Sequence, residues 1–382
     1  MKRSILQTAI VFILIVLIAG VSNLSAGTQN LTSSKQPSFN SIIYQKSIDM
    51  LIFVSPQYAT DIEIENAINL YIKAVKDDLG WNTKIIEIQK EDNEYIKIDE
   101  IIEHYYSLYS IKACIMVGED LDTALAGDCD YMEKPSVVPW FTTGGTGAYE
   151  TSVQGIICKP YKMDICISLI YPTHDLNYQT KKLQIINSFF KFSESRAISF
   201  SDDILVFESS DINANSKETY KKLGEQSNLN YMEDPTDIDV QRSLKESYSL
   251  YFVHGHSNPS GTILNAKEQS WFSAKYIDEL NSPFFGADGC YVAGWWSNKK
   301  DNGILDASIC GPYYGSEIFS SKATRAMVLG LLSQTGYSYS VSFVENAIPD
   351  LVGGKTLAES MIGDIYLGDN IVIGDPTFHY SG

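Results

Sequence analysis

Basic residues are scarce in this chain relative to acidic ones. Its 382 residues include 29 Lys and Arg against 47 Asp and Glu, which gives a formal net charge of −18. Because an acidic surface repels phosphate groups, this balance argues against nucleic acid or an anionic lipid surface as a partner. Cationic peptides are the partners that such a charge attracts.

Cysteine is sparse as well. Six cysteines are too few to form a disulfide-stapled scaffold, and a chain of 382 residues can bury a core without one. Cys114 and Cys166 fall inside apolar, strand-like runs, where a free cysteine behaves as a small buried hydrophobe. A phosphate-binding loop is also missing, because the GGTG segment at 144–147 follows no strand and lacks a Lys-Ser/Thr pair.

The longest apolar run stands at the N-terminus. Residues 9–20 are apolar without a break and follow Lys2 and Arg3, a pattern typical of an export signal. The run is shorter than the ~20 residues of a comfortable membrane span, which favours cleavage after Ala26 over an uncleaved anchor. We therefore interpret residues 1–26 as a signal peptide or N-terminal anchor and expect a secreted or cell-surface protein. Residues 27–48, rich in Ser, Thr, Asn and Gln, predict a flexible leader.

From residue 49 onward, short apolar runs alternate with segments of helical spacing. The runs predicted as strands are 49–54, 84–88, 113–118, 164–170, 203–207, 249–253, 283–287 and 326–332. Gly80 is expected to end the first helix, and a later helix carries Leu183, Ile186, Phe189 and Phe190 on one side. The alternation predicts an α/β fold with mostly parallel sheets flanked by helices.

Two reactive residues follow predicted strands. In YFVHGHS, His254 ends an apolar run and precedes Gly255, and in PFFGADGC, Cys290 comes shortly after another run. Carboxyl ends of parallel strands meet at one edge of a sheet, and neighbouring strands lie ~4.8 Å apart, so an imidazole and a thiol can meet there. In such a pair the imidazole lowers the pKa of the thiol, and the resulting thiolate can attack a peptide carbonyl carbon. The imidazolium then protonates the amine that leaves. We expect the intervening segment to hold one helix near 274–280, as in a single right-handed crossover.

Other interpretations of these residues are open. His254 and Cys290 could be an ordinary loop histidine and a buried thiol. His256 could be the base if the register slides by two residues. A zinc site built on His254, His256 and Cys290 lacks an evident fourth ligand, so we expect neither a metal nor another cofactor.

The two blocks resemble the His-Gly and Cys blocks of clan CD cysteine peptidases, which include caspases, legumain and gingipains. They are most similar to the gingipain family, as are the segments 49–81, 164–192 and 370–380. The resemblance implies a caspase-like α/β sandwich in two subdomains, an N-terminal one at 49–196 and a catalytic one at 197–382.

The resemblance also implies roles for individual residues. It makes Cys290 the nucleophile, His254 the general acid/base, and the backbone N–H groups of Gly255 and Cys290 an oxyanion hole. Glu208 matches the acidic residue that orients the histidine, although a solvated carboxylate at a strand end is an alternative. Asp211 matches a residue that contacts a basic substrate side chain, although a helix-capping role is equally compatible with its position.

The sequence thus predicts an exported cysteine endopeptidase that hydrolyses peptide bonds through a thioester. Its expected partner is a peptide or protein substrate, with no nucleic acid and with membrane contact only through a possible N-terminal anchor. Two alternatives remain: an inactive surface-anchored binding protein with the same fold, and thiol-dependent acyl transfer or self-processing.

Overall fold

The structure is a computed structural model, and it describes most of the chain from residue 47 onward. The described residues are 47–118, 121, 124–127, 133–136, 161–170, 172, 177–194, 196, 198–199, 203–211, 228–258, 261–273, 276, 279–288, 330–334, 342–363, 365–366 and 370–381. The predicted signal segment 1–26 lies outside them, as does all of the leader except its last two residues.

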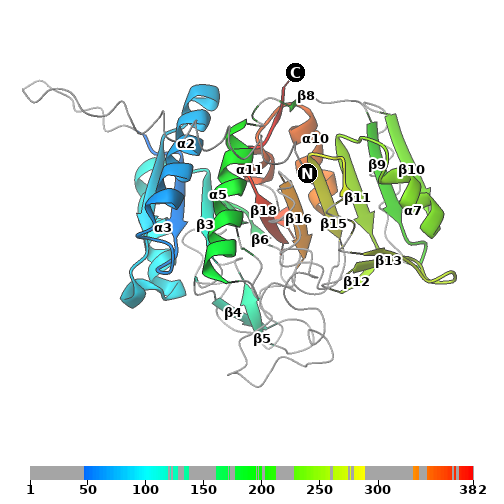
Figure 1. The fold of residues 1–382 in the computed structure, drawn as a ribbon, viewed down its shortest axis with the longest axis horizontal. Coiled ribbons are helices and arrows are strands. Elements are labelled where there is room, and N and C mark those ends of the chain that lie inside the picture. Colours follow the sequence, from blue (N-terminus) through cyan, green and yellow to red (C-terminus); the bar gives the residue numbers. More distant parts are fainter. Residues whose placement is uncertain are drawn as a thin grey trace, which may run out of the picture. The chain divides into compact units, whose positions relative to one another are not determined.

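A ten-stranded sheet runs through the described part of the chain, in the order β10-β9-β11-β15-β16-β18-β7-β3-β1-β2 (Figure 1). Its strands are β1 (Met50–Val54), β2 (Thr83–Glu87), β3 (Ala113–Val117), β7 (Cys166–Ile170), β9 (Asp203–Glu208), β10 (Asn228–Glu233), β11 (Leu250–His254), β15 (Phe284–Asp288), β16 (Gly330–Gln334) and β18 (Asn370–Gly374). Neighbouring strands are parallel throughout, except at β16 and β18. The predicted α/β class with mostly parallel strands is confirmed.

The antiparallel pair β16–β18 reverses the direction of the sheet. The six strands from β10 to β18 in the sheet order come from 197–382, and the four from β7 to β2 come from 49–196. Because of the reversal, the carboxyl ends of β9, β11 and β15 lie on one edge, whereas those of β1, β3 and β7 lie on the opposite edge. The division into two subdomains stays a prediction.

Helices connect and cover these strands. They are α2 (Ile62–Leu79), α3 (Tyr95–Tyr109), α5 (Tyr178–Glu194), α7 (Asp237–Ser243), α10 (Ser342–Val352) and α11 (Leu357–Met361), with a 3₁₀ turn at Lys90–Asp92. The Asp61 carboxylate caps α2 by accepting the backbone N–H groups of Glu63 and Ile64. The helix ends at Gly80, which adopts a φ of 73° that glycine tolerates. The predicted end at Gly80 is confirmed.

Helix α5 packs against α2 through a face that differs from the predicted one. The Phe189 ring lies 5.4 Å from that of Tyr71, and Ile185 is buried as well. Leu183 and Phe190, predicted on the same side as Phe189, are 54% and 42% exposed. At 100° per residue, both lie on the far side of the helix from Ile185, so the prediction for these two residues is wrong.

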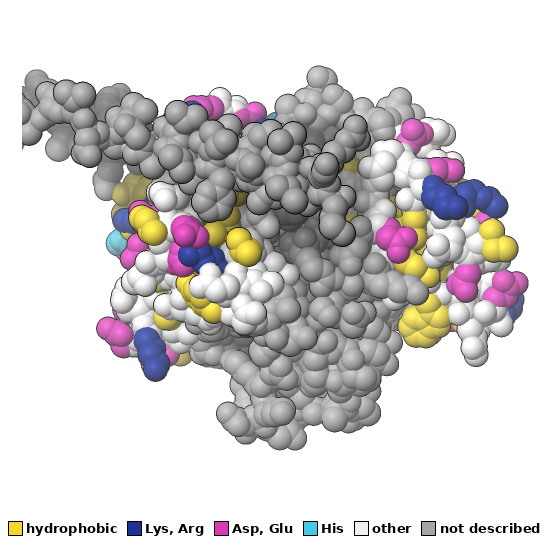
Figure 2. Space-filling model, in the orientation of Figure 1, with side chains coloured by type: hydrophobic (Ala, Val, Ile, Leu, Met, Phe, Trp, Pro, Cys, Tyr) yellow, Lys and Arg dark blue, Asp and Glu magenta, His cyan; other side chains and the backbone are white. Residues whose placement is uncertain are grey.

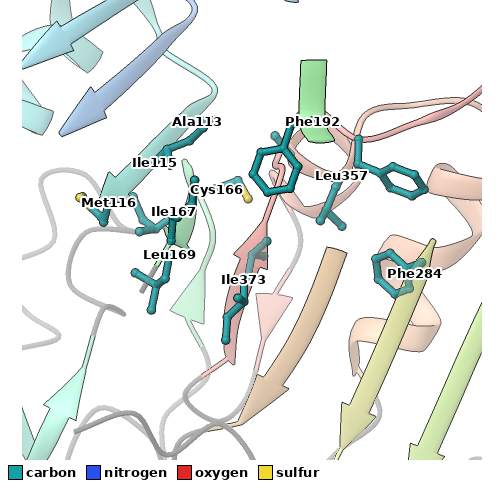
Figure 3. Packing of buried hydrophobic residues seen from close by; sticks show 14 of the residues in the cluster. Ala113, Ile115, Met116, Cys166, Ile167, Leu169, Phe192, Phe284, Leu357 and Ile373 are labelled. Carbon is teal, nitrogen blue, oxygen red and sulfur yellow. The ribbon is translucent and has the colours of Figure 1, made fainter. Parts of the chain in front are cut away.

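Strands β3 and β7 contribute to the hydrophobic core along their whole length. All five residues of β3 and all five of β7 are buried, as expected for strands covered on both faces. Cys114 and Cys166 are both free and buried here, which confirms their interpretation as small hydrophobes. Figure 3 shows Cys166 projecting from β7 into the packed cluster. Burial raises the pKa of both thiols well above the usual range.

The described residues also form smaller sheets beside the ten-stranded one. The connection from β11 to β15 forms an antiparallel sheet of β12 (His256–Asn258), β13 (Gly261–Asn265) and β14 (Ser270–Ser273), which the sequence did not predict. Of the helix predicted at 274–280, only residues 276, 279 and 280 are described. Three two-stranded pairs are β4 (Ala124–Gly127) with β5 (Glu133–Ser136), β6 (Tyr161–Lys162) with β17 (Ile365–Tyr366), and β8 (Ile198–Ser199) with β19 (Tyr380–Ser381).

Candidate active site

His254 and Glu208 form a buried pair at the carboxyl edge of the sheet. His254 is the last residue of β11 and Glu208 the last of β9, and the two lie side by side in the register of these parallel strands. The imidazole Nδ1 lies 2.9 Å from Glu208 Oε1. Each residue exposes only 4% of its surface. Glu208 is therefore not a solvated carboxylate at a strand end.

The chemistry of this pair follows from its burial. A carboxylate withdrawn from water needs a donor, and here the imidazole Nδ1–H supplies one. A proton held on Nδ1 by this hydrogen bond leaves Nε2 as the ring nitrogen that is free to exchange a proton. The backbone holds the same geometry, because the N–H of Ser209 donates to the carbonyl oxygen of His254 at 3.0 Å.

A third side chain contacts the pair from the edge of the sheet. The hydroxyl of Tyr231, in β10, donates to Glu208 Oε2. Apolar runs in the sequence predict neither this residue's role nor its strand. The segment NLNYME has few apolar residues in a row, and each of its residues is exposed or half-buried. Alternation of Leu229 and Tyr231 with polar residues is the signal that indicates an edge strand here.

The strand on the other side of His254 is β15. Its last residue, Asp288, lies in register with His254. The two strands are parallel neighbours, which is the condition under which the histidine and the cysteine were expected to be able to meet. Gly289 and Cys290 come next in the sequence and lie outside the described residues.

Gly255 occupies a position with no room for a side chain. An added Cβ would lie 2.0 Å from the carbonyl oxygen of Ile263 and 2.8 Å from Cγ2 of Thr262. Both residues belong to β13, which passes directly over the end of β11. A backbone this close to its neighbours leaves glycine as the residue that fits.

His256 and Asp211 form a second, more exposed pair. The His256 side chain is 60% exposed, and its Nε2 lies 3.6 Å from Asp211 Oδ2. Asp211 also accepts a hydrogen bond from the hydroxyl of Ser209. The two histidines therefore contact different carboxylates, and His254 is the buried one. The alternative capping role of Asp211 concerns a helix expected from residue 216, and residues 212–227 lie outside the described ones.

The surroundings of the site are acidic. Asp234 follows β10, and its carboxylate accepts both the hydroxyl and the N–H of Ser210, contacts that lower its pKa. On the face drawn in Figure 2, acidic and basic side chains of the described residues are interspersed.

Within the ranges given above, no three His, Cys, Asp or Glu side chains gather as a metal site would require. No helix in those ranges is both long and apolar enough to cross a membrane.

Two solved structures have a fold similar to that of this chain. No protein-family model and no curated protein matches the sequence. The crystal structure of the Arg-specific cysteine proteinase gingipain R (RgpB) superposes with a TM-score of 0.54 at 14% identity, over 89% of this chain and 80% of that one. A complex of Porphyromonas gingivalis RgpB pro- and mature domains gives a TM-score of 0.56 at 15% identity, over 87% and 79%. The fold is gingipain-like.

Proposed function

We propose that this chain is an exported cysteine endopeptidase of the gingipain family, with Cys290 as nucleophile and His254 as general acid/base. One observation carries the proposal: an imidazole buried against a carboxylate at the carboxyl edge of a parallel sheet, on the strand next to the one that leads to Cys290. Residues 1–26 support export to the cell surface or beyond it.

Each residue has a defined step in the reaction. Glu208 accepts the Nδ1–H of His254, so Nε2 takes the proton of the Cys290 thiol. The thiolate attacks the peptide carbonyl carbon, and the imidazolium then protonates the leaving amine. The product of this half-reaction is a thioester. His254 next takes a proton from water, whose oxygen attacks the thioester. The carbon–sulfur bond breaks, the acid leaves, and the imidazolium returns the proton to the Cys290 thiolate.

The oxyanion of both tetrahedral intermediates needs donors. In the proposed mechanism these are the backbone N–H groups of Gly255 and Cys290. This role is supported by the position of Gly255, which directly follows His254 at the carboxyl edge of the sheet. Donors of this kind lower the barrier by roughly 3 to 4 kcal/mol each.

The substrate class follows from charge. The net charge of −18 favours cationic peptides. Asp211 is the proposed contact for a basic substrate side chain, which would take the place of the His256 imidazole at its carboxylate. One of the structures with this fold is an Arg-specific proteinase. We therefore propose cleavage after Arg or Lys.

The proposal is tested by comparing the wild type with two variants and a matched control on a mixed pool of fluorogenic peptides. We expect Cys290→Ala and His254→Ala to lose at least ~100-fold in kcat/KM, as for removal of a nucleophile or general base. His256→Ala, which removes the neighbouring exposed imidazole, should retain activity within a few-fold. Loss in His256→Ala together with retention in His254→Ala would show that the base has been misassigned.

Alkylation with iodoacetamide at pH 7 gives an independent readout. Cys290 should react rapidly in the wild type and slowly in His254→Ala, because the imidazole populates the thiolate. Cys114 and Cys166 are internal controls that stay unlabelled until the protein is unfolded. An inert Cys290 with no turnover would favour a binding protein. Rapid labelling with amide products in the mass spectrum would favour acyl transfer.

A further inference from the structure

Glu208 is held at both of its carboxylate oxygens. Oε1 lies 2.9 Å from His254 Nδ1, and Oε2 accepts the hydroxyl of Tyr231. Tyr231 pairs with Val206, two residues before Glu208, so strand alternation puts Tyr231 and Glu208 on the same face of the sheet. Glu208 in turn pairs with His254 in β11. Tyr231, Glu208 and His254 therefore form a row across β10, β9 and β11.

We propose that Tyr231 is a positioning residue, which holds the Glu208 carboxylate in the orientation that fixes the His254 imidazole. The effect of Tyr231 on catalysis rests on the proposed peptidase function, whereas its hydrogen bond to Glu208 is independent of that function. A glutamate side chain has three rotatable bonds, and a single partner at one oxygen leaves several rotamers open. A second partner at the other oxygen restricts the carboxylate to one arrangement.

Tyr231 suits this role because its hydroxyl stays protonated. An ionised carboxylate only accepts hydrogen bonds, so the tyrosine must donate. Burial and the neighbouring Glu208 raise the pKa of Tyr231 above its usual value of about 10. The phenol therefore remains a neutral donor over the whole range in which an imidazole titrates.

The described titratable groups around Tyr231, Glu208 and His254 are mostly acidic, with His256 and Lys267 as neighbouring bases. Glu233 and Asp234, at the end of β10, act on Tyr231 through their charges. Asp211 follows β9 and contacts His256, and Asp288 of β15 lies in register with His254. Tyr231 thus stabilises the Glu208 carboxylate with a hydrogen bond, amid neighbours that add negative charge.

The experiment measures the His254 titration directly and needs no substrate. Full-length protein carrying ¹³C-labelled histidine is titrated by NMR, and His254 among the five histidines is identified through a His254→Gln variant. Tyr231→Phe removes the donor and keeps the ring. We expect the pKa of His254 to shift by about half a unit or more, as for loss of one hydrogen bond to a charged group.

Tyr248→Phe is the matched control. Its hydroxyl donates to Glu246 Oε2 at 2.5 Å, a tyrosine–glutamate bond of the same kind before the start of β11. We expect no shift of His254 in this variant. In a Glu208→Gln background, Tyr231→Phe should add little to the shift, because the tyrosine acts through that carboxylate.

Kinetics separate this inference from the proposed function. If the wild type is active, Tyr231→Phe should lower kcat about three- to tenfold and change KM less than about twofold, as expected for a less well positioned base. An unchanged His254 titration in Tyr231→Phe overturns the inference, whether or not the wild type cleaves peptides. A shifted titration in a protein without turnover supports Tyr231 and rejects the peptidase.

Discussion

At the end of β11, the lack of a side chain at Gly255 lets strand β13 of the small sheet β12–β14 pack against the strand end. Gly255 separates the buried His254 from the exposed His256, and β13 crosses over it. The missing Cβ admits the carbonyl oxygen of Ile263, so the packing of β13 against the end of β11 requires glycine at this position.

Replacing Gly255 by Ala should therefore lower the stability of the fold. The new methyl carbon would lie 2.0 Å from Ile263 O, so the backbone of β11 or β13 must move. We expect a loss of about 1 to 3 kcal/mol in the free energy of unfolding, measured by urea denaturation. The control is Gly353→Ala, whose nearest contact would be 3.2 Å, and it should cost less. Equal losses in the two variants would contradict the close approach at Gly255.

Among the helices, α3 carries a carboxylate in an unfavourable environment. Asp99 Oδ1 is buried and has no hydrogen-bond partner among the described residues. Burial, together with the charges of Glu103 and Glu100, raises the pKa of Asp99 to about 7. In the unfolded chain an aspartate has a pKa near 3.9. Between these values the unfolded chain is ionised while the folded protein keeps the proton.

This difference has a definite sign for stability. The contribution of Asp99 is complete below pH ~4 and is lost as the pH rises through about 7, so the wild type should weaken over this window. Asp99→Asn removes the titration. We expect the variant to be more stable than the wild type at pH 8, by an amount on the order of 1 to 2 kcal/mol, and equal to it at pH 4.

Urea midpoints at pH 4 and pH 8 measure the effect. Asp77→Asn on α2 is the control, because the Asp77 carboxylate is exposed and makes only a surface pair with Lys73. It should change stability little at either pH. A gain in Asp99→Asn that is the same at both pH values would mean that titration of this carboxyl group is not its cause.

Across the whole molecule, Arg196 joins segments that are far apart in the sequence. Its guanidinium contacts Asp78 at the end of α2, at 2.9 Å, and Asp375 in the turn after β18, at 2.7 Å. Tyr71 donates to the other oxygen of Asp375, and Thr377 accepts from Arg196. The turn after β18 is thereby tied to α2 and to the segment after α5.

Loss of this cation should be costly. Arg196→Met leaves the buried Asp375 carboxylate without its counter-ion, and we expect a loss of about 3 to 5 kcal/mol in the free energy of unfolding. Arg242→Met is the control, since Arg242 is exposed and lies 3.7 Å from Asp239. Urea denaturation at pH 7 compares the two. A small loss in Arg196→Met, matching the control, would show that the buried pair adds nothing net.

Local patterns were sufficient for much of the fold. Continuous apolar runs such as 113–118 predict fully buried strands, and Gly80 predicts a helix end, because burial and backbone conformation act on a few neighbouring residues at a time. Patterns failed where an element is half-buried or small. Edge strand β10 and the sheet β12–β14 went unpredicted, and on α5 two apolar residues face solvent.

The candidate site residues could be predicted from sequence patterns alone: a histidine and a cysteine after apolar strands, a glycine beside the histidine, and acidic residues at strand ends. Which of the described candidates contact one another depends on the assembled sheet. Glu208 and His254 are 46 positions apart, and Tyr231 and Glu208 are 23 apart. Their contacts depend on the order and direction of strands in the sheet, which long-range backbone hydrogen bonds select and which no local periodicity records.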